Sequence, residues 1–273
     1  MRFTLKEHDE QSNQQSLKCN SDEGVGVCFE VFSARSLVDG GHDGGVVSAL
    51  LVSGLERGLF DCAVVVQRGE GYRAEAVVAE SVDDVLEARG TKYLRVNTAA
   101  KLKGLVEAGR RRIAVVGTPC QVRASRKLQS SLSKNYPGLE LTLIGLFCFE
   151  AFNYEKLREE TRRLLGIDMD GAERTQIRKG RFIVRVDGKD SGVSVKDLKA
   201  AVEKGCNRCS DFTAECADVS VGSVGSSEGY STVIVRSQVG QRLLENLELN
   251  RGNVRKEEIV KLASLKRKRA LSS

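Results

Sequence analysis

Three short apolar runs in the first half of the chain constrain the fold most, because segments with helical spacing separate them. The runs are "CAVVVQ" (Cys62–Gln67), "RIAVVG" (Arg112–Gly117) and "LELTLIGLFC" (Leu139–Cys148). Continuous apolar runs of this length are typical of strands that are buried on both faces. Their alternation with helices predicts an α/β fold, in which helices flank a mixed, mainly parallel sheet.

The second half of the chain has a different pattern, typical of an α+β region. Polar and apolar residues alternate in "RTQIRKGRFIVRVDGKDSGVSVKD" (Arg174–Asp197), and Asp187-Gly188 marks a tight turn in the middle. This pattern predicts a β-hairpin. We place a boundary between the two halves near Phe149–Glu173, and we expect both halves to pack as one unit.

Composition excludes several classes of protein. Hydrophobic residues make up 41% of the 273 residues and charged residues 29%, which is ordinary for a globular protein. No apolar run reaches the roughly 20 residues of a membrane helix, and the polar start lacks a secretory signal. We therefore predict a cytoplasmic protein without a membrane span. The net charge is +6, and we interpret "LKRKR" (Leu265–Arg269) as a solvated basic tail and not as a nucleic-acid site.

Eight cysteines in a protein of the reducing cytosol indicate metal or redox chemistry rather than disulfides. Cys120 and Cys148 each follow the carboxyl end of a predicted buried strand, the edge where ligands collect in open α/β sheets. Cys206 and Cys209 form a C-x-x-C pair. Four thiolates from three segments suit a 4Fe-4S cluster, and the spacing alone leaves zinc equally open.

The other cysteines have simpler interpretations. Cys62 lies inside an apolar run and is expected to be a core residue. Cys19 and Cys28 are too far apart for a compact ligand loop. Cys216 follows Cys209 closely enough to be a reserve ligand.

Two glycine-rich segments suggest close approach of the backbone to a ligand. "VSVGSVGSSEGYSTVIVR" (Val219–Arg236) lies between strand-like segments and could also be a simple hairpin connection. It lacks the G-x-G-x-x-G spacing of dinucleotide-binding proteins. "GGHDGG" (Gly40–Gly45) precedes a predicted helix, whose N-terminus favours anions.

The motifs together resemble one family. "GTPCQVRASRK", "LIGLFC" and "GCNRCSDFTAECADVSVGSVGSSEGYSTVIVR" are similar to the beta subunits of coenzyme F420-reducing hydrogenase and of F420-dependent formate dehydrogenase. "SARS", "GHDGGVVSALL", "GLFDCAVVV" and "GTKY" resemble the N-terminal motifs of the family in the same order. The likeness runs from about Phe32 to the basic tail.

This resemblance implies an iron-sulfur flavoprotein. It would exchange hydride between coenzyme F420 and FAD, and pass single electrons through a 4Fe-4S cluster to or from a partner redox subunit. The partner would be of hydrogenase, formate dehydrogenase or other reductase type, in a hetero-oligomer. The cluster cysteines of the family match Cys120, Cys148, Cys206 and Cys209. The alternative is a structural zinc protein without redox activity that only binds a partner or a nucleotide and uses the cysteines to hold its fold.

The resemblance also implies a set of cofactor-binding residues and a division into domains. No catalytic side chain is assigned. His42, where the family more often has Gln, and Cys216, where it has an apolar residue, depart from its pattern. The expected domains are an N-terminal extension (1–30), an α/β domain for flavin and deazaflavin (31–150), an iron-sulfur and cofactor domain (151–260) and the basic tail (261–273). The cofactor-binding candidates are Gly44, Gly45, Lys92, Gly222, Ser223, Gly225, Gly229, Ser231 and Thr232.

Overall fold

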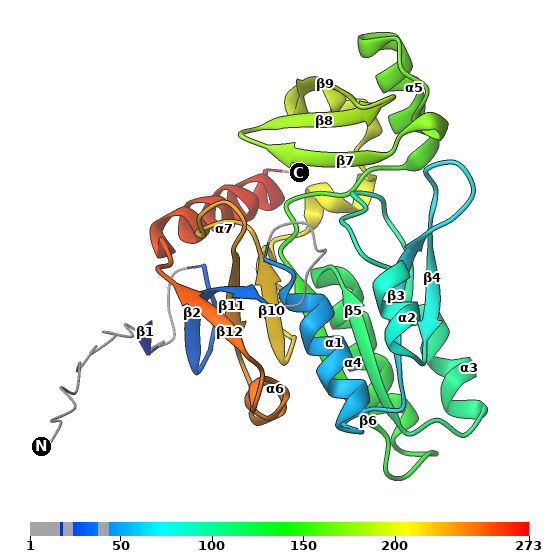
Figure 1. Cartoon of the computed structure of the whole chain (residues 1–273), viewed down its shortest axis with the longest axis vertical. Helices are drawn as coiled ribbons and strands as arrows, with labels where there is room; N and C mark the ends of the chain where they lie inside the picture. The colour runs from blue at the N-terminus through cyan, green and yellow to red at the C-terminus, as the bar shows by residue number, and fades with distance from the viewer. Residues whose placement is uncertain (1–16, 19–23, 38–43, 273) are drawn as a thin grey trace, which may run out of the picture.

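The computed structural model describes residues 17–18, 24–37 and 44–272, and its largest element is a nine-stranded mixed sheet (Figure 1). Cys19 and His42, both interpreted from the sequence, lie outside these residues. In spatial order the strands are β1 (Leu17–Lys18), β2 (Glu30–Ser36), β11 (Ser231–Val235), β10 (Val219–Gly222), β6 (Glu140–Leu146), β5 (Arg112–Gly117), β3 (Cys62–Arg68) and β4 (Ala74–Ala79), with β12 (Leu249–Gly252) also paired to β2.

The centre of this sheet is parallel and its two sides are antiparallel. Strands β10, β6, β5 and β3 run in one direction, whereas β4 on one side and β11 and β2 on the other pair antiparallel. The three apolar runs of the sequence are β6, β5 and β3. The predicted fold class, a mixed sheet with flanking helices, is therefore confirmed.

Side-chain alternation along the central strands builds a core on each face of the sheet. In β3, Ala63 and Val65 pack in the cluster beside α1 (Val46–Glu56), α2 (Val82–Glu87) and α6 (Gln238–Leu244). Cys62 and Val64 face the opposite cluster, beside α3 (Lys101–Glu107) and α4 (Pro119–Leu132). Cys62 is fully buried there, as expected of a core residue.

A second, three-stranded sheet follows α5 (Tyr154–Leu165) and lies at the top of Figure 1. It consists of β7 (Arg174–Arg178), β8 (Arg181–Val186) and β9 (Lys189–Ser194). Asp187 and Gly188 join β8 to β9 with φ of 48° and 70°, the two positive values of a tight hairpin turn. The predicted hairpin is confirmed.

Short 3₁₀ helices complete the chain between the larger elements. They are η1 (Thr98–Ala100), η2 (Met169–Gly171), η3 (Val195–Ala201) and η4 (Lys204–Arg208). The large sheet takes strands from both sides of residue 150. The division into domains stays a prediction.

The basic C-terminal segment forms the last helix, α7 (Lys256–Leu271), instead of a solvated tail. Ile259 and Ala263 anchor α7 in an apolar cluster with residues of β2 and β11. Lys266 lies on the same face and is only 1% exposed. The interpretation of "LKRKR" as solvated is therefore wrong for Lys266, because helical spacing aligns it with the two apolar residues. Within the described residues, no helix is long and apolar enough to cross a membrane.

Candidate functional site

Two of the predicted cysteines follow neighbouring parallel strands. Cys120 stands in the first turn of α4, directly after β5, and Cys148 follows the end of β6. Gly117 at the end of β5 is in register with Gly145 of β6, so both segments leave the sheet at the same edge. The helix macrodipole favours negative charge in the first turn of α4.

Backbone hydrogen bonds bring the C-x-x-C pair to this edge. The segment after β6 pairs with the segment around η4: Cys148 N donates to Phe212 O over 2.9 Å, and Glu203 N donates to Ala151 O over 3.0 Å. Ala151 N also donates to Cys206 Sγ over 3.4 Å. These bonds hold Cys148 and the C-x-x-C loop side by side.

The four thiols are close enough to influence one another electrostatically. Burial raises the pKa of the Cys148 thiol to about 12, and the thiols of Cys206, Cys120 and Cys209 add to the rise. Burial likewise raises the pKa of Cys206, and Cys120 and Cys209 act in the same direction. A metal bound here would have to displace the protons of Cys148 and Cys206, because cysteine binds metals as thiolate.

The arrangement of ligands bears on which metal centre would fit. Among the described residues, no three Cys, His, Asp or Glu side chains are placed to hold a single metal ion. A Cys₄ zinc site needs its sulfurs in a compact tetrahedron, about 2.3 Å from one ion. The donor set, four thiolates from three segments, suits either a 4Fe-4S cluster or a zinc ion.

The remaining cysteines stand apart from these four. Cys216 packs against the apolar cluster beside α4. Cys28 is disulfide-bonded, contrary to the expectation of reduced thiols throughout, and so has no thiolate to offer a metal.

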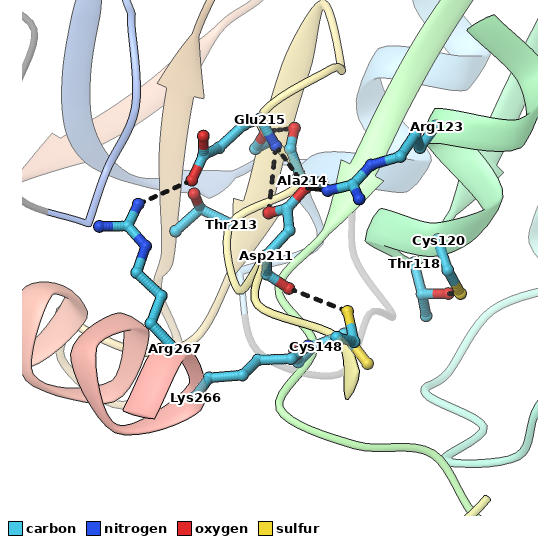
Figure 2. A network of polar contacts seen from close by, with 12 residues as sticks. Thr118, Cys120, Arg123, Cys148, Asp211, Thr213, Ala214, Glu215, Lys266 and Arg267 are labelled. Carbon is cyan, nitrogen blue, oxygen red and sulfur yellow. Dashed lines mark hydrogen bonds and ion pairs between the residues drawn. The ribbon is translucent and has the colours of Figure 1, made fainter. Parts of the chain in front are cut away.

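A polar network surrounds the cysteines (Figure 2). The Cys209 thiol donates to Asp211 O over 3.6 Å. The buried Asp211 carboxylate accepts from Glu215 N over 3.1 Å and lies 3.6 Å from the Arg123 guanidinium. Burial raises the pKa of Asp211. From the other side, Lys266 reaches out of α7 and donates to the Cys148 carbonyl oxygen.

A cavity lies beside the cysteine site, also at the carboxyl ends of the parallel strands. It is bounded by the N-terminus of α1, the ends of β3, β5 and β6, and the segment after α2. Its wall is mostly apolar, with a few hydroxyl and amide groups and two cationic side chains, Arg89 and Lys92. The lining residues include Val46, Leu51, Val65, Val116, Leu146, Ser48, Thr91, Thr98, Thr118 and Gln121.

Three of the predicted cofactor-binding residues line this cavity: Gly45, Lys92 and Ser231. Gly45 precedes α1 with φ of 66°, in the left-handed region that favours glycine. Gly44 lies just behind the wall, where its N–H donates to Ser231 Oγ over 3.2 Å. A Cβ on Gly44 would lie 2.5 Å from Ala34 O, so the glycine permits close packing of the chain on β2.

The other predicted residues lie away from the cavity wall. A Cβ on Gly222 would collide with Phe147, and one on Gly225 would press on Arg255 O and Ile259 of α7. Nothing lies within 4 Å of a Cβ on Gly229. Ser223 is exposed, and Thr232 is buried and donates to Val224 O over 2.8 Å. A cofactor role for these five residues, Gly222, Ser223, Gly225, Gly229 and Thr232, stays a prediction.

Lys92 presents an amine to the cavity with an unusual pKa. Burial lowers its pKa to about 8. Its Nζ donates to the carbonyl oxygens of Ala88 and Arg89 at 2.6 and 2.8 Å, at the end of α2. Lys92 is thereby fixed at the wall, and its charge changes near pH 8.

Two threonines complete the description of the cavity. Thr98 Oγ1 is buried and has no hydrogen-bond partner among the described residues, so it is available to a polar group of a ligand in the cavity. Thr118 lines the cavity and its Oγ1 is 3.3 Å from Cys120 Sγ, so a single turn joins the cavity to the cysteine site. Sequence reasoning missed both threonines and also Lys266; for Lys266 the available signal was its helical spacing from Ile259 and Ala263.

Comparison with known proteins identifies close relatives. The family model described as "Coenzyme F420 hydrogenase/dehydrogenase, beta subunit N-term" matches residues 28–103, and the corresponding model for the C terminus matches residues 110–261. The chain is 37% identical to the beta subunit of coenzyme F420 hydrogenase from Methanococcus voltae, over 78% of this chain and 77% of the relative.

Two further matches extend this comparison. The coenzyme F420-dependent sulfite reductase of Methanocaldococcus jannaschii is also 37% identical, over 90% of this chain. The chain spans only 44% of the length of that reductase. Among solved structures, a chain of the F420-reducing [NiFe] hydrogenase complex from Methanosarcina barkeri superposes with a TM-score of 0.87 at 30% identity, covering 93% of this chain and 94% of that one.

Proposed function

Because this chain belongs to the coenzyme F420 hydrogenase/dehydrogenase beta subunit family, we propose that it is a flavin- and iron-sulfur-containing oxidoreductase subunit. It exchanges hydride with coenzyme F420 and single electrons with a partner redox subunit of hydrogenase, formate dehydrogenase or other reductase type. We also propose that the chain forms a hetero-oligomer with this partner and that it works in the cytoplasm.

The observation that carries the proposal is the turn between β5 and α4. Gly117 and Thr118 line the cavity, and Cys120 follows within the same turn. A ligand in the cavity and a centre held by the cysteines would therefore be adjacent, as electron exchange between them requires. When bound, FAD supplies the exchange between a two-electron hydride carrier and a one-electron cluster.

Residues of the chain would hold the two groups as follows. Cys120, Cys148, Cys206 and Cys209 would ligate the cluster, with Cys148 and Cys206 brought together by the paired backbone after β6. The apolar cavity wall would take the flat ring and exclude water from it. Gly45 at the N-terminus of α1 offers backbone N–H groups to an anionic group, and Lys92 offers a positive charge.

An absorption spectrum tests the proposal most directly. The protein, purified anaerobically, is expected to be brown with flavin bands and to contain iron and sulfide. Reduced coenzyme F420 should bleach the flavin bands. A colourless protein that contains zinc would overturn the proposal in favour of a structural zinc protein.

A single variant separates the two halves of the activity. In Cys209→Ser, reduction of a dye that accepts electrons from flavin should survive, because the cavity is intact. Electron flow to the partner subunit should stop. Both are measured on one preparation that is folded and loaded with FAD, and loss of dye reduction with retained partner reduction would contradict the order flavin before cluster.

A further inference from the structure

Lys266 is a buried cation with no ion pair in the described part of the chain. Its neighbours on α7 both have carboxylates: Arg267 lies 3.0 Å from Glu215, and Arg269 lies 2.7 Å from Glu150. Lys266 is 1% exposed, and its Nζ donates to the Cys148 carbonyl oxygen. A buried ammonium is strongly unfavourable unless negative charge lies nearby.

The cysteines can supply this negative charge. Lys266 Nζ donates to the carbonyl oxygen of Cys148, so the ammonium lies beside the backbone of one cysteine. Three residues further along the same segment, Ala151 N donates to Cys206 Sγ over 3.4 Å, which holds a second cysteine next to it. Figure 2 shows the Lys266 side chain extended from α7 toward Cys148.

We propose that Lys266 is the counter-charge of the centre held by the four cysteines, and that it raises the reduction potential of this centre. A one-electron reduction adds one negative charge to the centre, and a fixed positive charge in a low-dielectric surrounding favours the more negative state. Lys266 would not contact a substrate, and it would affect electron transfer only through its charge beside the centre. The inference rests on the proposed function, because it assumes a redox-active centre.

Arg269 provides an internal comparison. Its guanidinium donates to Phe149 O and Cys206 O, so it also ties α7 to the cysteine segments. Its charge is balanced by Glu150, however, whereas that of Lys266 is not. The structure therefore assigns backbone anchoring to Arg269 and charge compensation to Lys266.

The test compares Lys266→Met, Lys266→Arg and Lys268→Met in the full chain, reconstituted anaerobically. Lys268 is an exposed cation on the same helix and controls for loss of one charge. The midpoint potential is measured by redox titration followed by electron paramagnetic resonance. Lys266→Met should lower the ratio of reduced to oxidised centre at a fixed potential about tenfold, equivalent to about 59 mV for one electron. Lys266→Arg should keep most of the wild-type value.

A shift in Lys266→Met no larger than that in Lys268→Met would overturn the proposal. Retention of iron in Lys266→Arg but not in Lys266→Met would support the proposal, because the Arg variant keeps the positive charge and the Met variant removes it. Iron loss in both variants would indicate a packing role and overturn it.

A second measurement does not depend on the identity of the metal. The gain in melting temperature on metal loading should be smaller in Lys266→Met than in the wild type, because the unloaded wild type buries an uncompensated charge. An equal gain in both proteins overturns the counter-charge role. Absence of iron and sulfide from the wild type would instead overturn the proposed function, while the melting comparison would still decide the role of Lys266.

Discussion

The cysteine site and the cavity share one edge of the sheet but differ in the side chains that line them. Around the cysteines lie buried charges, with Lys266 and Asp211 both almost fully buried. The cavity wall is largely apolar but carries two cationic side chains, Arg89 and Lys92, and among the described residues the buried Thr98 hydroxyl in it has no hydrogen-bond partner. This difference indicates that the cysteine site holds charges of both signs in its interior, whereas the cavity combines an apolar wall with positive charge at one side.

The largest expected effect is loss of the metal centre on removal of one ligand. Cys206→Ser should lose most of its iron and sulfide, because three remaining thiolates hold a cluster poorly. Cys216→Ser is the matched control, since Cys216 packs against the core beside α4. Iron and sulfide analysis measures both. Full iron content in Cys206→Ser with loss in Cys216→Ser would show that Cys216 is the fourth ligand.

Blocking the cavity should have the next largest effect and leave the cysteines intact. Ser48 lines the cavity from α1, so Ser48→Phe should exclude a flat ring and reduce the FAD content strongly. Iron content should stay at the wild-type level. Ser130→Phe makes the same change at an exposed position of α4 and should keep FAD. Normal FAD content in Ser48→Phe would place the flavin elsewhere.

The sequence predicted the cysteine site better than the cavity, for a physical reason. Strand ends and the C-x-x-C spacing limit where a thiol can lie, so Cys120, Cys148, Cys206 and Cys209 could be grouped before the structure was known. The structure places these thiols within electrostatic range of one another; that they ligate a cluster stays a prediction.

A glycine in the sequence indicates a ligand site less clearly than a cysteine does, because glycine is also used in turns and in close packing. Gly225 packs on α7, whereas Gly45 lines the cavity. Lys266 escaped prediction because a run of basic residues is usually solvated, and only tertiary packing showed which of its members is buried.

A moderate change in the free energy of unfolding should distinguish glycines that are needed for packing from glycines that contact a ligand. Gly225 has φ of 89°, and a Cβ there would lie 3.0 Å from Arg255 O. Gly225→Val should therefore lower the free energy of unfolding by roughly 3 kcal/mol. Gly229→Ala, with φ of 78° and open space, should lower it by only about 1 kcal/mol. Urea unfolding measures both variants.

FAD content decides between packing and ligand binding at Gly225. If the residue serves packing, the folded fraction of Gly225→Val should bind FAD at the wild-type ratio. Loss of FAD from a protein of unchanged stability would instead support the predicted contact between Gly225 and the cofactor.

The smallest expected effect concerns the pH dependence given by Lys92. Its pKa is about 8 in the folded chain, below the ordinary value of 10.5, so the unfolded chain holds this proton more tightly. The free energy of unfolding should therefore rise with pH between these two values, and the contribution is lost as pH falls through 8. Lys92→Met should lack this rise, and Lys101→Met, which removes an exposed lysine, should keep it.

The burial of Cys148 acts in the opposite direction, because its pKa is raised from 9.0 to about 12 and its protonated form is the one that folding favours. Its contribution is lost as pH rises above 9 in the wild type and in both lysine variants, so the difference between urea titrations isolates Lys92. Binding of an anionic cofactor group beside Lys92 should raise the pKa of the amine and move the rise in stability to higher pH. Identical profiles with and without FAD would show that the anionic part of the cofactor does not reach Lys92.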